Sequence, residues 1–240
     1  MHCTTTKTSL SVIEPLRALF LHEFNGQYVH NKCHLYGWAD AWLLQLNGQP
    51  VGYGSVWGKE QRADRDSIFE FYVLPDYRRW ARECFGALRE AAQTPFIECQ
   101  SNDFLLTAML YEHARSIYAE AILFEDQYAT HFPMGNRQWQ AASSDNPNDV
   151  PFILTEAGET IASGGLMLNY NKPYADLYYE VVESRRRQGI GALMVQQLKK
   201  AAYDLHRIPA ARCNIKNAIS KATLLKGGFG VCGYILQGEL

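Results

Sequence analysis

The run Arg186-Arg187-Gln188-Gly189-Ile190-Gly191-Ala192-Leu193 joins two elements of different hydrophobic period. Residues 177–182 before it are largely apolar and predict a β-strand, whereas residues 192–205 after it predict an amphipathic helix. A glycine-rich turn between a strand and a helix presents free backbone N–H groups to a phosphate, because glycine permits unusual dihedrals and close approach of a ligand. The spacing Arg-x-x-Gly-x-Gly differs from the dinucleotide and Walker patterns, and it predicts a phosphate-binding turn of another kind.

Composition and charge narrow the class of protein. Of the 240 residues 47% are apolar, so the chain can bury a sizeable core in one large domain or two small ones. Lys and Arg number 23 against 25 Asp and Glu, and this balance argues against nucleic acid or an anionic membrane as the main partner. No apolar run reaches the ~18 residues of a membrane span, and residues 1–11 lack the apolar core of a signal peptide. The six cysteines are scattered, so we expect a cytoplasmic protein without a disulfide framework or a metal.

The two halves of the chain repeat one pattern. Asn47-Gly48 separates two apolar runs and is a strong hairpin signal, and Ala157-Gly158 lies between two similar runs in the second half. In both halves a strand, a turn and a helix follow, and then a second short strand and a second helix. The later strands are expected at 95–99 and 209–213, and the later helices near 105–116 and 218–225. The first half also has room for helices at 10–24 and within 27–40, which the second half lacks.

A polar, turn-rich stretch at residues 141–149 is the expected boundary between the copies. We therefore predict an α/β fold of two tandem domains, residues 1–135 and 136–240, that pack together. The alternative is a single domain whose halves are similar by accident.

Residues 152–236 resemble the GCN5-related N-acetyltransferase (GNAT) superfamily. The glycine turn is similar to the family's motif A, which holds the pyrophosphate of acetyl-CoA. The family's later signature, Asn-x-x-Ala-x-x-Leu-Tyr-x-x-x-Gly-Phe, is matched by Asn217-x-x-Ser220-x-x-Thr223-Leu224-x-x-x-Gly228-Phe229. The resemblance implies a mixed α+β sheet, two tandem GNAT-like acyl-CoA N-acyltransferase domains, and acetyl-CoA as co-substrate.

The same resemblance implies which groups hold acetyl-CoA. In the family, the strand before the turn offers backbone groups to the pantetheine arm, the turn amides face the pyrophosphate, and arginines add positive charge. The alternative for this turn is an ordinary strand–helix connection with solvated arginines. The expected cofactor-binding residues are Val181, Val182, Arg186, Arg187, Gln188, Gly189, Ile190, Gly191, Ala192, Asn217 and Ser220.

The first copy departs from the motif. A shift of 108 residues (186 − 78) places Ala81 on Gly189 and Glu83 on Gly191. A carboxylate facing a pyrophosphate is repulsive, and a side chain blocks close approach of the backbone. We expect the first copy to be degenerate, without acetyl-CoA binding, and to serve as structure and as one wall of the substrate cleft.

Two carboxylates are candidates for the base that deprotonates an attacking amine. Asp176 and Glu180 are four residues apart on the predicted central strand, so their side chains lie on one face. Glu180 lies nearer to the expected thioester and is slightly preferred, although each could equally be a surface or ion-paired carboxylate. Leu224 stands where many relatives carry a tyrosine that protonates the leaving thiolate, so no general acid is assigned.

Two weaker patterns have plain structural alternatives. Tyr170, Tyr174, Tyr178 and Tyr179 could line an acceptor pocket, but aromatic residues are also favoured in strands. His30 and His34 are one helical turn apart, with Cys33 beside His34, but this pair of histidines has no obvious third ligand for a metal site.

The function expected from these features is transfer of acetyl from acetyl-CoA to an amine by direct attack in a ternary complex. The acceptor is a small-molecule or peptide amine of unknown identity, and the protein is a monomer or a homodimer. The alternative is a non-catalytic acyl-CoA-binding or sensor protein, which the leucine at position 224 and the degenerate first copy would suit.

Overall fold

The computed structural model describes residues 2–27, 31–61 and 63–240. The chain forms two compact units, Met1–Glu120 with Tyr234–Leu240, and Ala121–Gly233. This division differs from the predicted boundary between residues 135 and 136, because two long strands each begin in one unit and end in the other. Among the described residues, no helix is long and apolar enough to cross a membrane.

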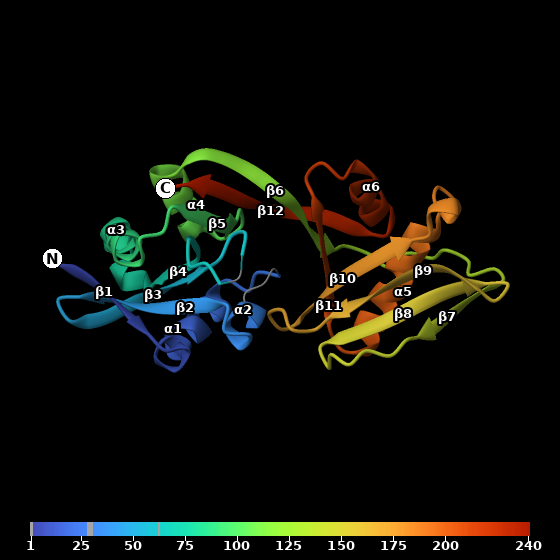
Figure 1. The fold of residues 1–240 in the computed structure, drawn as a ribbon, viewed down its shortest axis with the longest axis horizontal. Coiled ribbons are helices and arrows are strands. Elements are labelled where there is room, and N and C mark those ends of the chain that lie inside the picture. Colours follow the sequence, from blue (N-terminus) through green and yellow to red (C-terminus); the bar gives the residue numbers. More distant parts are fainter. Residues whose placement is uncertain (1, 28–30, 62) are drawn as a thin grey trace. The chain divides into compact units, whose positions relative to one another are not determined.

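The first unit contains both kinds of element in the predicted order (Figure 1). Its helices confirm the predictions for 10–24 and for part of 27–40. The elements are β1 (Cys3–Thr8), α1 (Leu10–Glu23), α2 (Asn31–Leu35), β2 (Ala39–Leu46), β3 (Gln49–Trp57), β4 (Ser67–Val73), the 3-10 helix η1 (Pro75–Trp80), α3 (Ala81–Ala92), β5 (Phe96–Gln100), α4 (Phe104–His113) and the start of β6 (Arg115–Asp126).

The second unit repeats this order without the first two helices. Residues 142–148 connect two strands directly, so the stretch expected as a domain boundary is a loop inside the second unit. The elements are β7 (Arg137–Ala141), β8 (Asp149–Glu156), β9 (Glu159–Met167), β10 (Tyr174–Val181), η2 (Glu183–Arg185), α5 (Ile190–Asp204), β11 (Ile208–Asn214), α6 (Ala218–Lys226) and the start of β12 (Phe229–Glu239).

Each unit has a mixed sheet, as predicted. In the first unit the strand order is β1-β2-β3-β4-β5-β12, and in the second it is β6-β11-β10-β9-β8-β7. The pairs β4–β5 and β10–β11 are parallel, and the other pairs within these two orders are antiparallel. One end strand of each order comes from far along the chain: residues 235–239 of β12 pair with β5, and residues 121–125 of β6 pair with β11.

The parallel pair of the second unit opens along its length. β10 pairs with β11 only from Tyr174 to Asp176, although β10 continues to Val181 and β11 to Asn214. In strands that separate in this way, backbone groups beyond the last pair have no partner in the neighbouring strand. The opening therefore lies directly before the glycine-rich turn.

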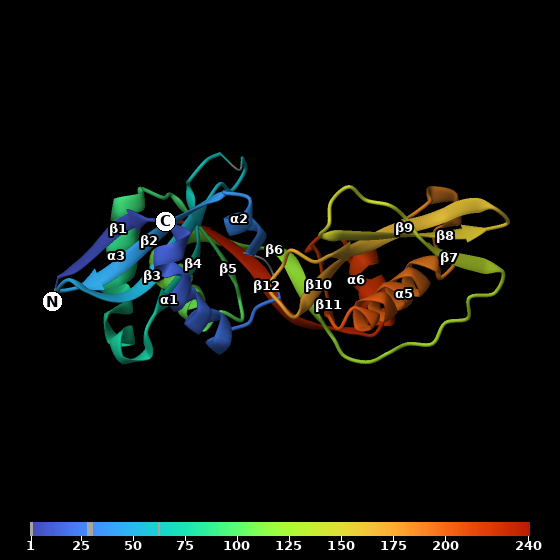
Figure 2. The ribbon, with the colours of Figure 1, turned by 90° about the horizontal axis from the view of Figure 1, so that it is seen from below.

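Helices α5 and α6 pack side by side against one face of the second sheet (Figure 2). Their apolar faces form a common core with β10 and β11, and this core includes Val195, Leu198, Ala211, Leu224 and Phe229. Burial of large apolar side chains contributes about 1.5–3 kcal/mol each. The packing fixes the N-terminal ends of both helices beside the opening between the strands.

Both predicted hairpins are confirmed, with one turn geometry. Asn47 and Gly48 have φ values of 50° and 84°, and Ala157 and Gly158 have values of 51° and 84°. Two successive residues with positive φ are the turn that matches the twist of an antiparallel pair. The two halves therefore repeat each other in backbone conformation at these turns as well as in sequence pattern.

Candidate functional site

The turn between β10 and α5 adopts a left-handed conformation at two positions. Arg187 has φ of 61° and Gly189 has φ of 79°, and Gly189 is the N-cap of α5. A non-glycine residue with positive φ costs of order 1–3 kcal/mol and is found mainly at functional loops. A chain that alternates between left- and right-handed residues aims successive N–H groups into one concavity that suits an anion.

The first turn of α5 leaves backbone donors without an acceptor inside the helix. The first helical bond runs from the Leu193 N–H to the Gly189 carbonyl at 3.2 Å. No side chain caps the helix start, so the N–H groups of residues 190–192 have no intrahelical partner. Together with the helix dipole, these donors make a site for a phosphate group.

Two glycines of the expected motifs permit close packing, Gly191 at this turn and Gly228 after α6. A Cβ atom on Gly191 would lie 3.0 Å from the Thr223 Cγ2 atom of α6. Gly228 has φ of 84°, and a Cβ there would lie 2.2 Å from the Tyr128 carbonyl oxygen. Only glycine fits at the first position of the Gly228-Phe229 pair, because the chain following α6 crosses another backbone segment there.

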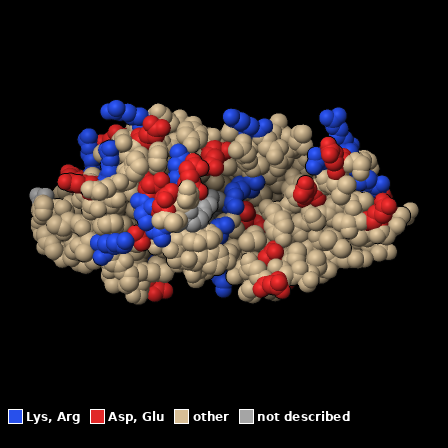
Figure 3. All heavy atoms as spheres, in the orientation of Figure 1, with Lys and Arg blue, Asp and Glu red and all other residues tan. Residues whose placement is uncertain are grey.

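A cavity of about 1060 Å³ opens beside these groups. That is at the upper end of the roughly 300–1,000 Å³ typical of small-molecule and cofactor sites. Figure 3 shows basic and acidic side chains mixed over the end of the unit where Figure 1 draws the turn before α5. The lining residues are Tyr179, Glu180, Val181, Glu183, Arg185, Arg186, Arg187, Gly189, Gly191, Ala192, Asn217, Ala218, Ile219, Ser220, Ala222, Thr223 and Lys226.

The basic side chains at the cavity differ in the ion pairs and hydrogen bonds that they form. Arg185 pairs with Glu156, so its charge is already balanced. Arg186 donates from Nε to the Val181 carbonyl at 3.1 Å and lies 3.8 Å from Glu180. Arg187 lines the cavity, and its side chain is exposed. Arg186 and Arg187 both line the cavity, and their role in holding an anion stays a prediction.

The pairing of β10 decides which backbone groups face the opening. The Val182 N–H donates to the Ile161 carbonyl at 3.0 Å, and the Val182 carbonyl accepts from Arg185 at 2.9 Å. Val182 therefore has no backbone group left for a pantetheine arm, contrary to the prediction. Because alternate residues of a strand direct N–H and C=O to opposite neighbours, Val181 and Tyr179 face the side where β11 has separated.

The predicted residues of α6 take partly structural roles. Asn217 is the N-cap of α6, and its Oδ1 atom accepts from the Ser220 N–H at 2.9 Å. Both residues also line the cavity. The side chains of two other predicted residues lie elsewhere: Ile190 is buried at 2% exposure in the core, and Gln188 donates to the Ser184 carbonyl. They could act only through their backbone amides.

The two candidate carboxylates lie in different surroundings. Glu180 is at the cavity wall, and 79% of its side chain is exposed. Asp176 does not line the cavity; its Oδ2 atom lies 3.4 Å from Arg212, and 13% of its side chain is exposed. The structure therefore brings Glu180 to the cavity and pairs Asp176 with a cation.

Most of the four tyrosines and the residues of the His/Cys pattern make local structural contacts. Only Tyr179 of the four tyrosines lines the cavity; Tyr178 donates to Asp149 at 2.7 Å, and Arg212 donates to Tyr170. In the first unit the His34 Nε2 atom lies 2.9 Å from Glu70, and Cys33 packs with Trp57 and Phe69. His30 lies outside the described residues. Among those residues no group of His, Cys, Asp and Glu has the arrangement of a metal site.

The first unit lacks the left-handed turn. At the matching place η1 runs directly into α3, and no residue from Pro75 to Ala92 has positive φ. Ala81, at the position of Gly189, is buried in the core at 4% exposure. The backbone there follows a helical path instead of opening its N–H groups toward a ligand.

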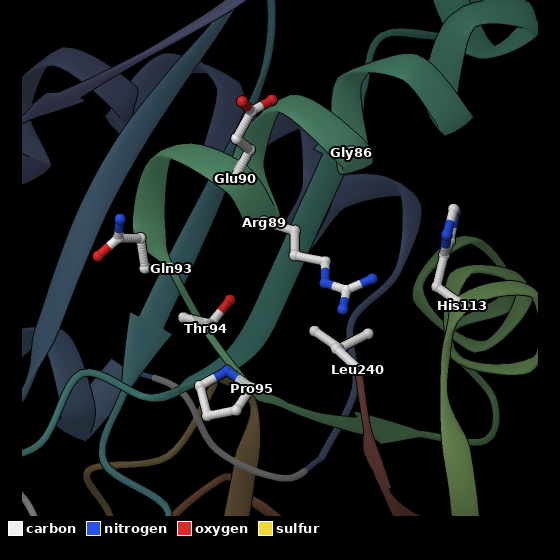
Figure 4. A pocket seen from close by; sticks show the side chains of 8 residues that line it. All are labelled: Gly86, Arg89, Glu90, Gln93, Thr94, Pro95, His113 and Leu240. Atoms are coloured by element: carbon white, nitrogen blue, oxygen red, sulfur yellow. The ribbon is translucent and has the colours of Figure 1, made fainter.

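The first unit has a cavity of its own, of about 570 Å³, at the other end of α3 (Figure 4). It is lined by Arg89 and Gln93 near the C-terminal end of that helix and by His113 at the end of α4. A helix presents carbonyl oxygens at its C-terminal end, which disfavours an anion. This cavity is therefore not a counterpart of the one beside the glycine turn.

Sequence reasoning missed several lining residues. Lys226, Ala218, Ile219 and Ala222 all come from α6. The signal for Lys226 is its spacing, because Asn217, Ser220, Thr223 and Lys226 recur every three residues and so follow one face of the helix. A second source of positive charge thus lines the same cavity as the arginines of the turn.

Known proteins of one family are similar to this chain in sequence pattern and in fold. The sequence model of the acetyltransferase (GNAT) family matches residues 107–229. No curated protein sequence matched the chain. Among solved structures, a GNAT-family acetyltransferase from Colwellia psychrerythraea is 16% identical, with both chains covered completely and a TM-score of 0.77.

Two further structures have the same fold. A tandem GNAT protein from the clavulanic acid biosynthesis pathway is 12% identical over 99% of this chain and 98% of its own, with a TM-score of 0.66. A GCN5-related N-acetyltransferase from Sphaerobacter thermophilus is 11% identical over 99% and 95%, with a TM-score of 0.60. The family match spans more than half of the chain and includes every residue that lines the larger cavity, so the chain belongs to the GNAT acetyltransferase family, whose co-substrate is acetyl-CoA.

Proposed function

We propose that the second unit binds acetyl-CoA and transfers its acetyl group directly to an amine in a ternary complex. The observation that carries this proposal is the start of α5, where Gly189 with φ of 79° opens three unpaired N–H groups beside a cavity. The pyrophosphate would accept from these donors, and Arg187 and Lys226 would add charge from opposite sides. The pantetheine arm would pair with the outward-facing backbone of Val181 and Tyr179.

The chemistry needs few protein groups. The amine nitrogen attacks the thioester carbonyl carbon, the C–S bond breaks, and the amine proton passes to a base. Glu180, at the cavity wall, would accept that proton directly or through water. The Tyr179 N–H faces the opening and would polarise the thioester carbonyl, while the cavity holds the reactants in position.

A panel assay tests the reaction. The protein is mixed with acetyl-CoA and, in separate reactions, with a polyamine, free amino acids, an aminoglycoside or a short peptide. Release of CoA thiol is followed with a disulfide reagent that forms a coloured product with thiols. We expect amine-dependent thiol release with at least one acceptor class, because the family acts on such small-molecule or peptide amines. Binding of acetyl-CoA without thiol release from any amine would contradict the proposal.

That contrary result would support the second candidate, a non-catalytic acyl-CoA-binding or sensor protein. One observation favours it: Leu224, at the position of the usual tyrosine, is 1% exposed and packs in the core. The same panel separates the two candidates, since only an enzyme consumes the bound thioester.

A further inference from the structure

Tyr179 is a polar group at the cavity whose hydrogen-bonding capacity is not used. It lies on β10, where β11 has already separated, and it lines the cavity. Its hydroxyl oxygen is shielded from solvent and has no hydrogen-bond partner among the described residues. A buried donor left without a partner costs about 1–3 kcal/mol, so it is expected where a ligand atom completes the bond.

The ring of Tyr179 runs toward both helix starts. One ring carbon, Cε2, lies 3.7 Å from the place of a Cβ atom on Gly191 in the first turn of α5. The hydroxyls of Ser220 and Thr223 on α6 are close enough to ease its ionisation, but neither completes a hydrogen bond with it. The phenol therefore extends from the central strand to α6, one turn from Leu224.

We propose that Tyr179 donates the proton that the CoA thiolate takes up as it leaves, in place of the side chain that Leu224 lacks. As the amine nitrogen bonds to the acetyl carbon, the C–S bond breaks with its electron pair on sulfur. The Tyr179 hydroxyl proton moves to that sulfur, and the phenolate is reprotonated by water. This inference rests on the proposed acetyl transfer.

Neighbouring groups are less suited to the same task. The Thr223 hydroxyl already donates to the Ile219 carbonyl at 2.9 Å, and aliphatic hydroxyls are far weaker acids than a phenol. Burial raises the pKa of Tyr179 above its ordinary value of about 10, against the lowering effect of Ser220 and Thr223. The phenol therefore keeps its proton at neutral pH, as a donor must.

The test compares Tyr179→Phe with the wild-type protein. Because the hydroxyl makes no bond in the free protein, we expect an unchanged or slightly higher Tm and an unchanged Kd for acetyl-CoA. We expect kcat with the best amine of the panel to fall by on the order of 100-fold, the lower end for loss of a general acid. The matched control is Tyr203→Phe, which removes a hydroxyl bonded to Asp126 at 2.6 Å outside the cavity and leaves kcat unchanged.

The outcomes separate this inference from the proposed function. A wild-type protein that releases no thiol with any amine would overturn both. A wild-type protein that turns over while Tyr179→Phe keeps full kcat would overturn the inference alone. A variant that loses acetyl-CoA binding but keeps kcat at saturation would also overturn it, because Tyr179 would then be a binding residue.

Discussion

Gly189 is the residue on which the proposed phosphate-binding turn depends most. Its φ of 79° is a conformation that side chains other than glycine rarely adopt, and a Cβ there would meet open space. Gly189→Ala therefore adds backbone strain of about 1 kcal/mol without a clash. We expect weaker acetyl-CoA binding in calorimetry, because relief of the strain would turn the N–H groups of α5 away from the cavity.

Gly48→Ala is the matched control for this change. Gly48 has φ of 84°, and a Cβ there also meets open space, but it lies in the hairpin turn of the first unit. Both variants should lose similar stability, and only Gly189→Ala should lose affinity. Equal affinities in the two variants would show that the turn does not hold the ligand.

Glu180 should matter for turnover and not for binding. Its carboxylate lies at the cavity wall and is exposed, so Glu180→Gln removes a proton acceptor with little change in packing. We expect kcat with the best amine to fall by about 10²–10⁴-fold while the Kd for acetyl-CoA is unchanged. Glu159→Gln, on β9 outside the cavity, is the control, and unchanged turnover in Glu180→Gln would move the role of base to Asp176 or water.

At the scale of elements, Lys199 on α5 holds the chain that follows α6. Its Nζ atom lies 2.6 Å from Asp126 and donates to the carbonyls of Tyr128, Gly227 and Gly228 at 2.7, 3.2 and 3.0 Å. The Lys199 side chain is only 2% exposed. Removing one partner of a buried ion pair typically costs 3–5 kcal/mol, because the other charge is left unpaired.

Lys199→Met should therefore lower the Tm by on the order of 10 °C. The control is Lys200→Met, since Lys200 is the next residue of α5 and is exposed. A thermal melt followed by circular dichroism measures both variants. An unchanged Tm in Lys199→Met would mean that the ion pair and its three carbonyl bonds contribute no net stability.

The elements predicted well are those with a local cause. Asn47-Gly48 and Ala157-Gly158 form their turns because the two residues themselves permit positive φ. The direction of the Val182 backbone groups, in contrast, could not be predicted from nearby residues. Whether its N–H faces β9 or the opening depends on strand register, and register is set by the partner strand and not by nearby sequence.

At the scale of the whole molecule, the ends of β6 and β12 could not have been foreseen. Residues 121–125 pair with β11 and residues 235–239 pair with β5, so each sheet needs a strand from beyond the predicted boundary. Two strand-like runs give no sign of which sheet they join, because that choice depends on long-range pairing. The two compact units differ from the predicted boundary between residues 135 and 136 for this reason.

The same pairings predict how fragments behave. A fragment of residues 136–240 lacks the strand that pairs with β11, and a fragment of residues 1–135 lacks the strand that pairs with β5. Each would leave a row of unpaired backbone groups at a sheet edge. We expect neither fragment to show a cooperative thermal transition alone, whereas cooperative melting of both would show that the exchanged strands are dispensable.

We propose that only the second of the two copies binds acetyl-CoA, and calorimetric titration of the full chain with acetyl-CoA is the decisive experiment. Gly191→Glu is the test variant, because a side chain there would meet Thr223 in the cavity wall, and Glu83→Ala changes the matching position of the first copy. We expect one site per chain that is lost in Gly191→Glu and kept in Glu83→Ala. Two sites, no binding, or binding that survives Gly191→Glu would contradict it.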